Sequence, residues 1–267
     1  MTEINRVIWQ YWEGPLPEYL ALCMATVKAH AGDAEVRVLD RDGFNKLFKH
    51  DKDIDLDRLT PVQRSDFIRA YLLKEHGGLY FDVDCIVMQS LEPVFQAAEK
   101  TGFVVVHQDD GEIQTNFIAS PAHGPVVSDL YKGICETLRS GKKLAWLDLA
   151  TVPLVPAVEA HSETVTYLPT ELICPIHWSE PEKFAAKTTD ENHKENLNQN
   201  SLCYMMSNDT IKSRDQVSFL RSLSKDEILA GDYFMSFLFR RSLSVEKPSN
   251  DVAYKSNPSV PKFNGAM

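Results

Sequence analysis

Residues 60–88 read TPVQRSDFIRAYLLKEHGGLYFDVDCIVM. This stretch predicts a capped helix, a two-glycine stop and a buried strand. Thr60 can cap the helix and Gln63 completes a capping box, with a proline between them in the first turn. Gly77 can take the left-handed position that ends a helix, and Gly78 lets backbone or ligand approach closely.

The strand in this stretch ends in Asp82-Val83-Asp84. Alternate side chains of an extended strand share a face, so both carboxylates can point at one site, roughly 7 Å apart at their Cα atoms. They repel unless something positive lies between them, and Mg²⁺ and Mn²⁺ prefer oxygen ligands while keeping waters or substrate phosphates. The pair therefore predicts a Mn²⁺ or Mg²⁺ site in an enzyme with a phosphate-bearing substrate. For an isolated Asp-x-Asp, solvated strand-end carboxylates are the alternative.

A second pair of charges precedes the strand. Asp66 and Arg69 are three positions apart and so lie together on one face of the helix. Arginine is a planar donor that suits a diphosphate. The alternative is an ordinary surface pair.

The composition limits the class of protein. The chain has 267 residues with 43% hydrophobic residues and a net charge of −10, enough for one large α/β domain or two small ones. The acidic balance argues against nucleic-acid binding and against strong electrostatic attachment to a membrane. The five cysteines are scattered, with no C-x-x-C pair, which indicates a reduced, cytoplasmic protein. The N-terminus does not resemble a signal peptide, and we expect no transmembrane segment.

Strand and helix patterns alternate through the first half of the chain, which favours a mainly parallel sheet with helices on both faces. In such sheets ligands bind at the carboxyl ends of strands, where Asp82 and Asp84 lie. We expect the polar stretch 186–200 to be a loop. The predicted strands are 4–12, 35–39, 79–88, 102–107, 116–119, 164–168 and 172–176, and the predicted helices are 17–30, 60–76, 91–99, 125–140 and 225–240.

The run SDFIRAYLLKEHGGLYFDVDCIV at 65–87 resembles the DXD signature of sugar-nucleotide glycosyltransferases with the GT-A fold, and more narrowly glycosyltransferase family 32 and related capsular-polysaccharide synthesis proteins. The segments at 4–14, 115–127 and 165–178 are similar to other parts of that family, so the resemblance covers roughly residues 4–208. It implies an α/β, GT-A (Rossmann-like) single domain with a mainly parallel central sheet flanked by helices. We expect this domain to span residues 1–246, followed by a flexible C-terminal tail at 247–267.

The resemblance also implies roles for matching residues. The nucleotide would be held near the first and third strands, and the donor sugar and diphosphate would meet the helix and the DXD pair. The implied catalytic residues are Asp66, Arg69, Asp82, Asp84 and Asn116, the implied nucleotide-binding residues are Trp9, Gln10, Ser65, Gly78 and Tyr80, and the implied metal ligands are Asp82, Asp84 and Asn208.

Two positions depart from the family pattern. Met205 stands where many relatives carry a late metal-ligating histidine, and Ser207, Asn208 or Asp209 are the candidate substitutes, of which we select Asn208. Thr151-Val152-Pro153 stands where relatives carry Thr-Gly-Pro. Both departures concern the part of the site that comes from the C-terminal half of the chain.

The resulting hypothesis is a metal-dependent, retaining glycosyltransferase. It would move a sugar from a UDP- or GDP-sugar donor to a glycan or lipid-linked glycan acceptor in capsule or lipopolysaccharide synthesis, in the cytoplasm or peripherally at the inner face of the membrane. Two alternatives stay open: a phosphohydrolase of the haloacid-dehalogenase type, whose DxD usually lies nearer the N-terminus, and an inactive nucleotide-sugar-binding module.

Overall fold

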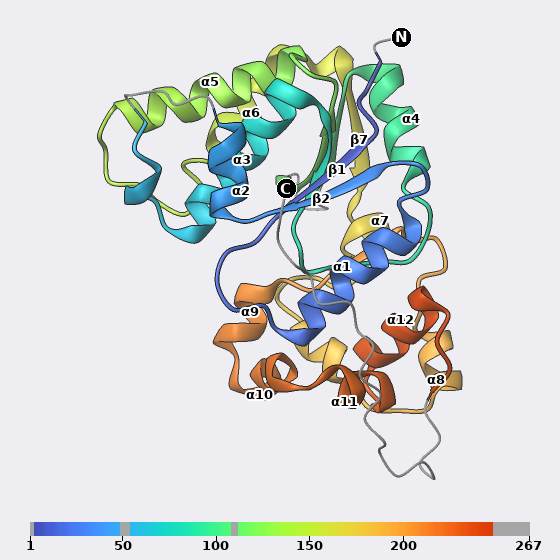
Figure 1. Cartoon of the computed structure of the whole chain (residues 1–267). Coiled ribbons are helices and arrows are strands. Elements are labelled where there is room, and N and C mark those ends of the chain that lie inside the picture. Colours follow the sequence, from blue (N-terminus) through green and yellow to red (C-terminus); the bar gives the residue numbers. More distant parts are fainter. Residues whose placement is uncertain (1–2, 49–53, 108–111, 248–267) are drawn as a thin grey trace.

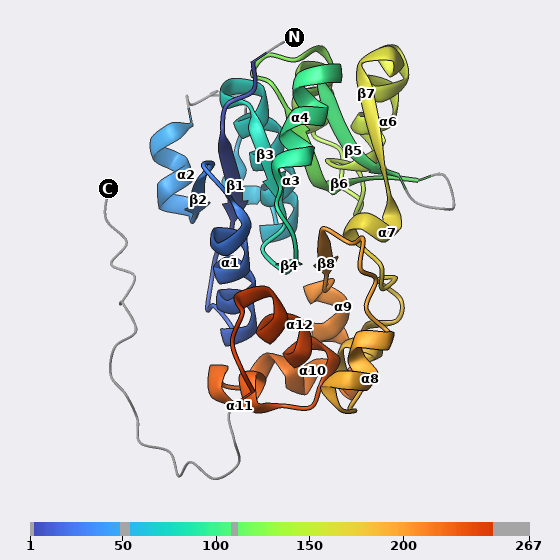
Figure 2. The ribbon, with the colours of Figure 1, turned by 90° about the vertical axis from the view of Figure 1, so that its right-hand side faces the viewer.

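The computed structural model describes residues 3–48, 54–107 and 112–247. A six-stranded central sheet with strand order β2-β1-β3-β6-β5-β7 lies between helices (Figures 1 and 2). β1 pairs in parallel with β2 and β3, and β5 pairs in parallel with β7, whereas β6 is antiparallel to β3 and β5. This mixed α/β architecture with a mostly parallel sheet confirms the predicted fold class.

The strands of the central sheet are β1 (Val7–Tyr11), β2 (Glu35–Leu39), β3 (Gly78–Phe81), β5 (Phe103–His107), β6 (Ile113–Ser120) and β7 (Val165–Pro169). The helices along the first two thirds of the chain are α1 (Glu18–His30), α2 (Arg41–Leu47), α3 (Pro61–His76), α4 (Glu92–Thr101), α5 (Pro125–Arg139), α6 (Thr151–Ala160) and α7 (Thr170–Ile173). The helices that follow are α8 (Asp190–Glu195), α9 (Asn208–Ser213), α10 (Asp215–Ser218), α11 (Lys225–Ala230) and α12 (Phe234–Leu243).

Alternating side chains of β1 give the sheet two buried faces. Trp9 and Tyr11 pack in the cluster beneath α3, α5 and α6, whereas Ile8 packs in the opposite cluster with residues of α4. This alternation is what a strand covered on both faces requires. A third cluster joins α1 to the helices after residue 208 and forms the lower part of the molecule in Figure 1.

The predicted start and stop of the α3 helix are confirmed in their main features. Thr60 and Gln63 form the capping box. Gly77 has a φ of 65° and a ψ of −172°, so its φ is positive but its ψ is not that of a left-handed helix. A Cβ on Gly77 would lie 2.5 Å from the Ala122 nitrogen, and one on Gly78 would lie 2.5 Å from the Val7 carbonyl oxygen. Both glycines therefore serve close backbone packing.

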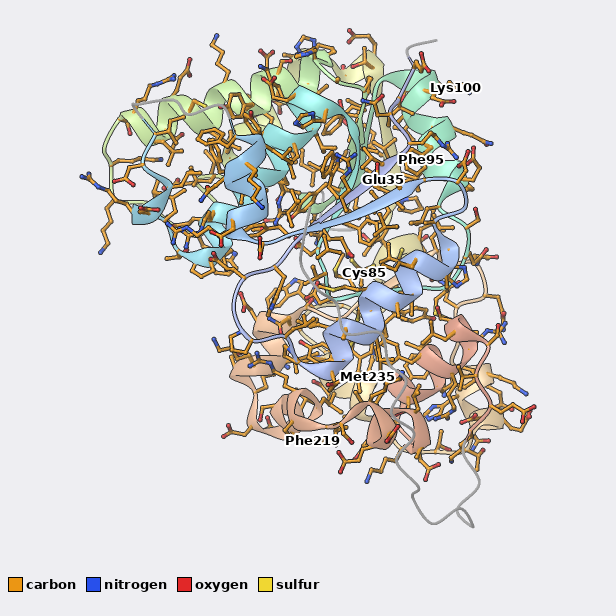
Figure 3. All side chains as sticks on the ribbon, in the orientation of Figure 1. Glu35, Cys85, Phe95, Lys100, Phe219 and Met235 are labelled. Atoms are coloured by element: carbon orange, nitrogen blue, oxygen red, sulfur yellow. The ribbon has the colours of Figure 1, made fainter. Side chains whose placement is uncertain are left out.

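The predicted single strand 79–88 is wrong in one respect. It splits at a turn into β3 and β4 (Cys85–Val87), and β4 leaves the central sheet to pair antiparallel with β8 (Cys203–Met205). The turn contains Val83 and Asp84, so the two DXD carboxylates do not lie on one flat strand face. Cys85, directly after this turn, lies where the layers around the sheet meet the lower helices (Figure 3).

Three other predictions fail in the second half of the chain. The predicted strand at 172–176 begins inside α7. The stretch 186–200 contains α8, whose His193 is buried and bonds the Asp232 carbonyl, so it is docked rather than a free loop. The helix expected at 225–240 is divided into α11 and α12. Of the predicted tail 247–267, all but Lys247 lies outside the described residues, and the domain division stays a prediction.

Candidate active site

Asp82 lies at the carboxyl end of β3, where three strands of the sheet meet. Its backbone N–H donates to the Asn116 carbonyl of β6 at 3.0 Å, and its own carbonyl accepts from Gln10 Nε2 of β1 at 3.5 Å. The Asp82 side chain is 32% exposed, so its carboxylate can meet a ligand. The strand-end location agrees with the rule for ligand sites in open α/β sheets.

Asp84 is held by the segment that follows β8. Its carbonyl accepts from Met206 N–H at 2.9 Å, and its Oδ2 accepts from Asn208 N–H at 2.6 Å. The other oxygen, Oδ1, is buried and has no hydrogen-bond partner among the described residues. A buried carboxylate oxygen without a partner carries a large desolvation cost, which a cation or a ligand proton would offset.

Arg69 organises the carboxylates from inside α3. Its Nη2 lies 3.0 Å from Asp82 Oδ1 and 3.3 Å from Asp66 Oδ1, and its Nη1 donates to Thr115 Oγ1 at 3.0 Å. Its guanidinium also lies over the Tyr80 ring. The Arg69 side chain is only 5% exposed. These contacts place the Arg69 guanidinium against Asp82 inside the protein, and its expected role toward a donor diphosphate stays a prediction.

The carboxylates form a region of excess negative charge. Burial, followed by the charge of Asp82, raises the pKa of Asp84 to about 7. Burial also raises the pKa of Asp82, although Arg69 opposes the shift. Asp209 adds a third negative charge that acts on both groups. Burial raises the pKa of Asp66 to about 6 against the pull of Arg69. The DXD pair thus lacks a full internal countercharge.

A hard divalent cation fits this environment, with Asp84 Oδ1 and Asp82 as its oxygen donors. In the three described stretches, however, no group of three His, Cys, Asp or Glu residues could hold a metal ion. The Asn208 side-chain oxygen, predicted as a ligand, accepts from the Tyr19 hydroxyl. Met205 is buried in the core opposite Cys85 and offers nothing to the site.

The residues expected to bind the nucleotide divide into two groups. Trp9 is 1% exposed and its indole N–H donates to the Gly77 carbonyl at 2.9 Å, so its ring is a packing element rather than a platform for a base. Tyr80 is fully buried and its hydroxyl bonds Ser65 Oγ at 2.9 Å. Gly78 contacts the backbone of β1. These residues support the site from behind.

Gln10 and Asn116 form the second group, because their side-chain oxygens have no hydrogen-bond partner among the described residues. Gln10 Oε1 and Asn116 Oδ1 are buried without hydrogen-bond partners, on the two strands that flank Asp82. Amide oxygens in this state can accept hydrogen bonds from the hydroxyl or N–H groups of a ligand. Two contributors were missing from the predicted set. Thr115 was a neighbour of a predicted residue, whereas Tyr19 carried no sequence signal because nothing in a helix pattern links it to residue 208.

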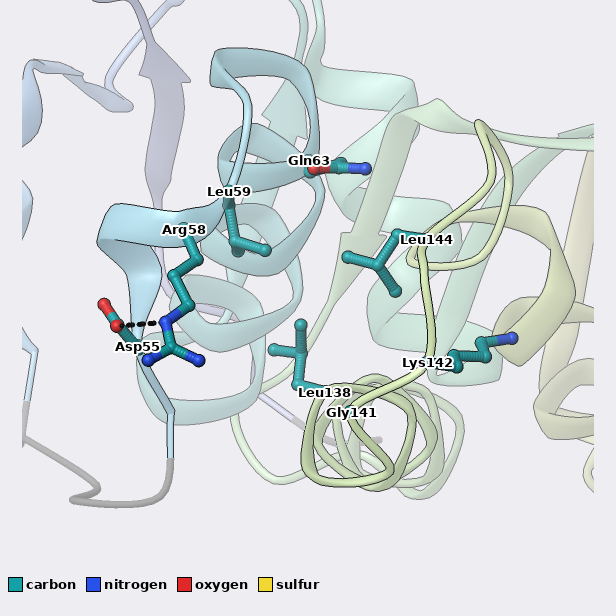
Figure 4. Close-up of a pocket in the computed structure, with 8 residues that line it drawn as sticks. All are labelled: Asp55, Arg58, Leu59, Gln63, Leu138, Gly141, Lys142 and Leu144. Atoms are coloured by element: carbon teal, nitrogen blue, oxygen red, sulfur yellow. Dashed lines mark ion pairs between the residues drawn. The ribbon is translucent and has the colours of Figure 1, made fainter.

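The molecule also has a pocket away from the DXD pair. It has a volume of about 320 Å³ and lies between the 3₁₀ turn η1 (Leu56–Arg58), the start of α3 and the segment after α5 (Figure 4). It is lined by Asp55, Arg58, Leu59, Gln63, Leu138, Gly141, Lys142 and Leu144. None of the predicted site residues is among them.

Comparison with known proteins agrees with the geometry around Asp82 and Asp84. Residues 17–101 match the family model described as a glycosyltransferase sugar-binding region containing DXD motif. No curated protein matches the chain. Among solved structures, the PaToxG glycosyltransferase is 14% identical over 90% of this chain and 87% of that chain, with a TM-score of 0.47. Residues 17–101 are thus similar to a glycosyltransferase sugar-binding region containing a DXD motif, and Asp82-Val83-Asp84 lies within this matched stretch.

Proposed function

We propose that this protein is a metal-dependent glycosyltransferase that moves a sugar from a UDP- or GDP-sugar to a glycan acceptor. The observation that carries the proposal is the unpartnered Asp84 Oδ1 beside the partly exposed Asp82, inside a region that matches a DXD sugar-binding family. Excess negative charge at the end of an apolar strand suits a site that acquires a cation together with a diphosphate.

The chemistry divides between the cation and the chain. When bound, Mn²⁺ or Mg²⁺ would act as a Lewis acid that stabilises the charge left on the departing nucleoside diphosphate. Asp82 and Asp84 would hold the cation, and Arg69 keeps the Asp82 carboxylate oriented toward it. Gln10 and Asn116 would accept hydrogen bonds from the donor. Asp82 and Asp84 are ligands here and not an acid–base pair of the glycosidase kind.

The finer assignment concerns stereochemistry and biology. The proposal also includes transfer with retention of configuration and membership of glycosyltransferase family 32. It further includes a role in capsule or lipopolysaccharide synthesis, with a glycan or lipid-linked glycan as acceptor. The five cysteines are free thiols, which supports a reducing, cytoplasmic location, with a peripheral place at the inner membrane face as the alternative. Separately, none of the helices in the described part of the chain has the length and apolarity that a membrane crossing requires.

The test is donor turnover without an acceptor. The purified protein is incubated with Mn²⁺ and a panel of UDP- and GDP-sugars, and release of free sugar and nucleotide is followed. We expect slow hydrolysis of one donor that stops on chelation of the metal and in Asp84→Asn. Asp33→Asn is the matched control, because Asp33 is an exposed carboxylate in a surface ion pair, and it should leave turnover unchanged.

Other outcomes would contradict the proposal in defined ways. Phosphate release from simple monoesters, with no donor turnover, would favour the haloacid-dehalogenase type of enzyme. Saturable binding of a nucleotide sugar without turnover, even with a range of glycan acceptors, would favour an inactive binding module.

A further inference from the structure

Next to the DXD turn, a partly buried chain of polar contacts joins three distant segments. The Tyr19 hydroxyl of α1 donates to the side-chain oxygen of Asn208, the first residue of α9. The Asn208 backbone N–H in turn donates to Asp84 Oδ2 at 2.6 Å. The Tyr19 side chain is fully buried. One hydroxyl is thus linked through a single residue to one oxygen of the Asp84 carboxylate.

The Tyr19 hydroxyl has two polar neighbours, because it is also hydrogen-bonded to the Arg221 side chain. Tyr19 packs in the apolar cluster of the lower helices, where the ring of a phenylalanine would fill the same space. Burying a hydroxyl is costly unless it makes a hydrogen bond. Burial and the nearby Asp84 charge raise the pKa of Tyr19, so its hydroxyl keeps the proton that it donates. Since a guanidinium can only donate, the proton of the hydroxyl is given to Asn208 and its oxygen is left to accept from Arg221.

The residue before Asn208 has an unusual backbone conformation, which sets the position of the Asn208 backbone N–H. Ser207 has a φ of 57° and a ψ of 65°, in the left-handed region that non-glycine residues rarely occupy. Such a conformation persists only when the surroundings hold it in place. Tyr19 supplies one such restraint from the side-chain end of Asn208, and Asp84 supplies the other through the backbone N–H.

The consequence falls on Asp84. Its backbone carbonyl is held by Met206 N–H and its Oδ2 by Asn208, which leaves Oδ1 buried and unpartnered. We infer that Tyr19 and Asn208 are positioning residues that occupy Asp84 Oδ2, so that Asp84 binds the divalent cation through Oδ1 alone. This inference rests on the proposed function, and it gives Asn208 a supporting role in place of the direct ligation expected from the sequence.

The test compares two tyrosines of one core cluster. Tyr19→Phe removes the hydroxyl that holds Asn208, whereas Tyr204→Phe removes a buried hydroxyl that accepts from Asn198 N–H and does not touch the DXD turn. Mn²⁺ is titrated calorimetrically into the full chain in the presence of UDP and, separately, of GDP. We expect Tyr19→Phe to weaken Mn²⁺ binding by about 10–100-fold, the usual loss for groups that orient a metal ligand, and Tyr204→Phe to leave it unchanged.

A second variant keeps the test decisive if Tyr19→Phe folds poorly. Asn208→Ala removes the acceptor of the Tyr19 proton but keeps the backbone N–H, and it should weaken Mn²⁺ binding in the same way. Unchanged Mn²⁺ affinity in a folded Tyr19→Phe would overturn the inference and leave the proposed function standing. So would a loss confined to Asn208→Ala, which indicates direct ligation by the amide. Absence of Mn²⁺ binding by the wild-type chain with both nucleotides would overturn the metal part of the proposed function, and this inference with it.

Discussion

The two aspartates of the DXD motif are held by two differently built regions. Asp82 is oriented by Arg69, which lies 13 positions away on the preceding helix. Asp84 is oriented by Asn208, which lies 124 positions away after β8. The Asp82 side is a charged network in which a buried arginine contacts the carboxylate directly. On the Asp84 side the oxygens of Asp84 accept from backbone N–H groups, and Arg221 bonds Tyr19 rather than the carboxylate.

This difference explains the distribution of charge. Arg69 lies between Asp66 and Asp82 and opposes the rise in the pKa of each carboxyl. Asp84 receives only neutral donors, and burial raises its pKa to about 7. An Asp whose ionised form lacks a countercharge is well suited to bind an added cation. Thus the Asp82 carboxylate has a countercharge within the protein, whereas the Asp84 carboxylate accepts from a neutral backbone N–H group.

The largest expected effect is a loss of stability when the contacts of Arg69 with Asp66 and Asp82 are removed. Arg69→Met leaves two buried or partly buried carboxylates without their partner and should lower the free energy of unfolding by about 3–5 kcal/mol. Arg37→Met is the control, because Arg37 forms an exposed pair with Glu35 worth about 0–1 kcal/mol. Urea denaturation measures both. Equal losses in the two variants would mean that the Arg69 network adds nothing beyond a surface pair.

The next largest effect is a loss of activity when the charge of Asp84 is removed. Asp84→Asn keeps the acceptor for Asn208 N–H but removes the charge, and should lower donor turnover by more than about 100-fold, above the range for groups that only orient a ligand. Its thermal stability in the absence of metal should be unchanged or higher, because a poorly compensated buried charge is gone. Steady-state assays and thermal denaturation check the two halves. Full activity would show that the cation site lies elsewhere.

A smaller effect is the pH dependence of stability that Asp66 contributes on the Asp82 side. The pKa of Asp66 is raised to about 6 by burial, so the unfolded chain loses this proton at lower pH than the folded chain does. The contribution of Asp66 to stability is then full below about pH 4 and declines as the pH rises to about 6. Asp66→Asn should therefore gain about 1–3 kcal/mol relative to wild type between pH 4 and pH 7. Denaturation curves at both pH values measure this, and parallel pH profiles would contradict it.

The smallest effect concerns the incomplete Asp84 side. Since the described residues provide no three-residue metal group, Mn²⁺ should bind weakly to the nucleotide-free protein, and UDP or GDP should tighten it by about 10-fold or more. Coupling is reciprocal, so Mn²⁺ must tighten the nucleotide equally. Calorimetry in both orders tests this. Tight Mn²⁺ binding without nucleotide, unaffected by changes at Ser207, Asn208 and Asp209, would mean that the chain builds a complete site by other residues.

The sequence predicted those parts of the molecule in which neighbours along the chain decide the outcome. The capping box at Thr60, the two-glycine stop and the strand at Glu35–Leu39 follow from local rules that operate over a few residues. Asp66, Arg69 and Asp82 were also found, because one helix and the strand after it bring them together. In the segment 186–200 a local signal was overlooked, because Thr189 caps α8 and acidic residues fill its first turn, while the bond from His193 to Asp232 docks the helix.

What only the tertiary structure decided is how these residues are used. Local pattern could not show that β4 leaves the sheet for β8, because strand pairing depends on a partner more than a hundred residues away. It could not show that Arg69 is enclosed by Ser65, Thr115 and the carboxylates, with Asp82 within hydrogen-bond distance. Nor could it join Tyr19 to Asp84 through Asn208, since these three residues are far apart along the chain and no local pattern links them. The sequence by itself determined which chemical groups stand at the end of β3, and long-range packing determined which of their oxygens is left for a ligand.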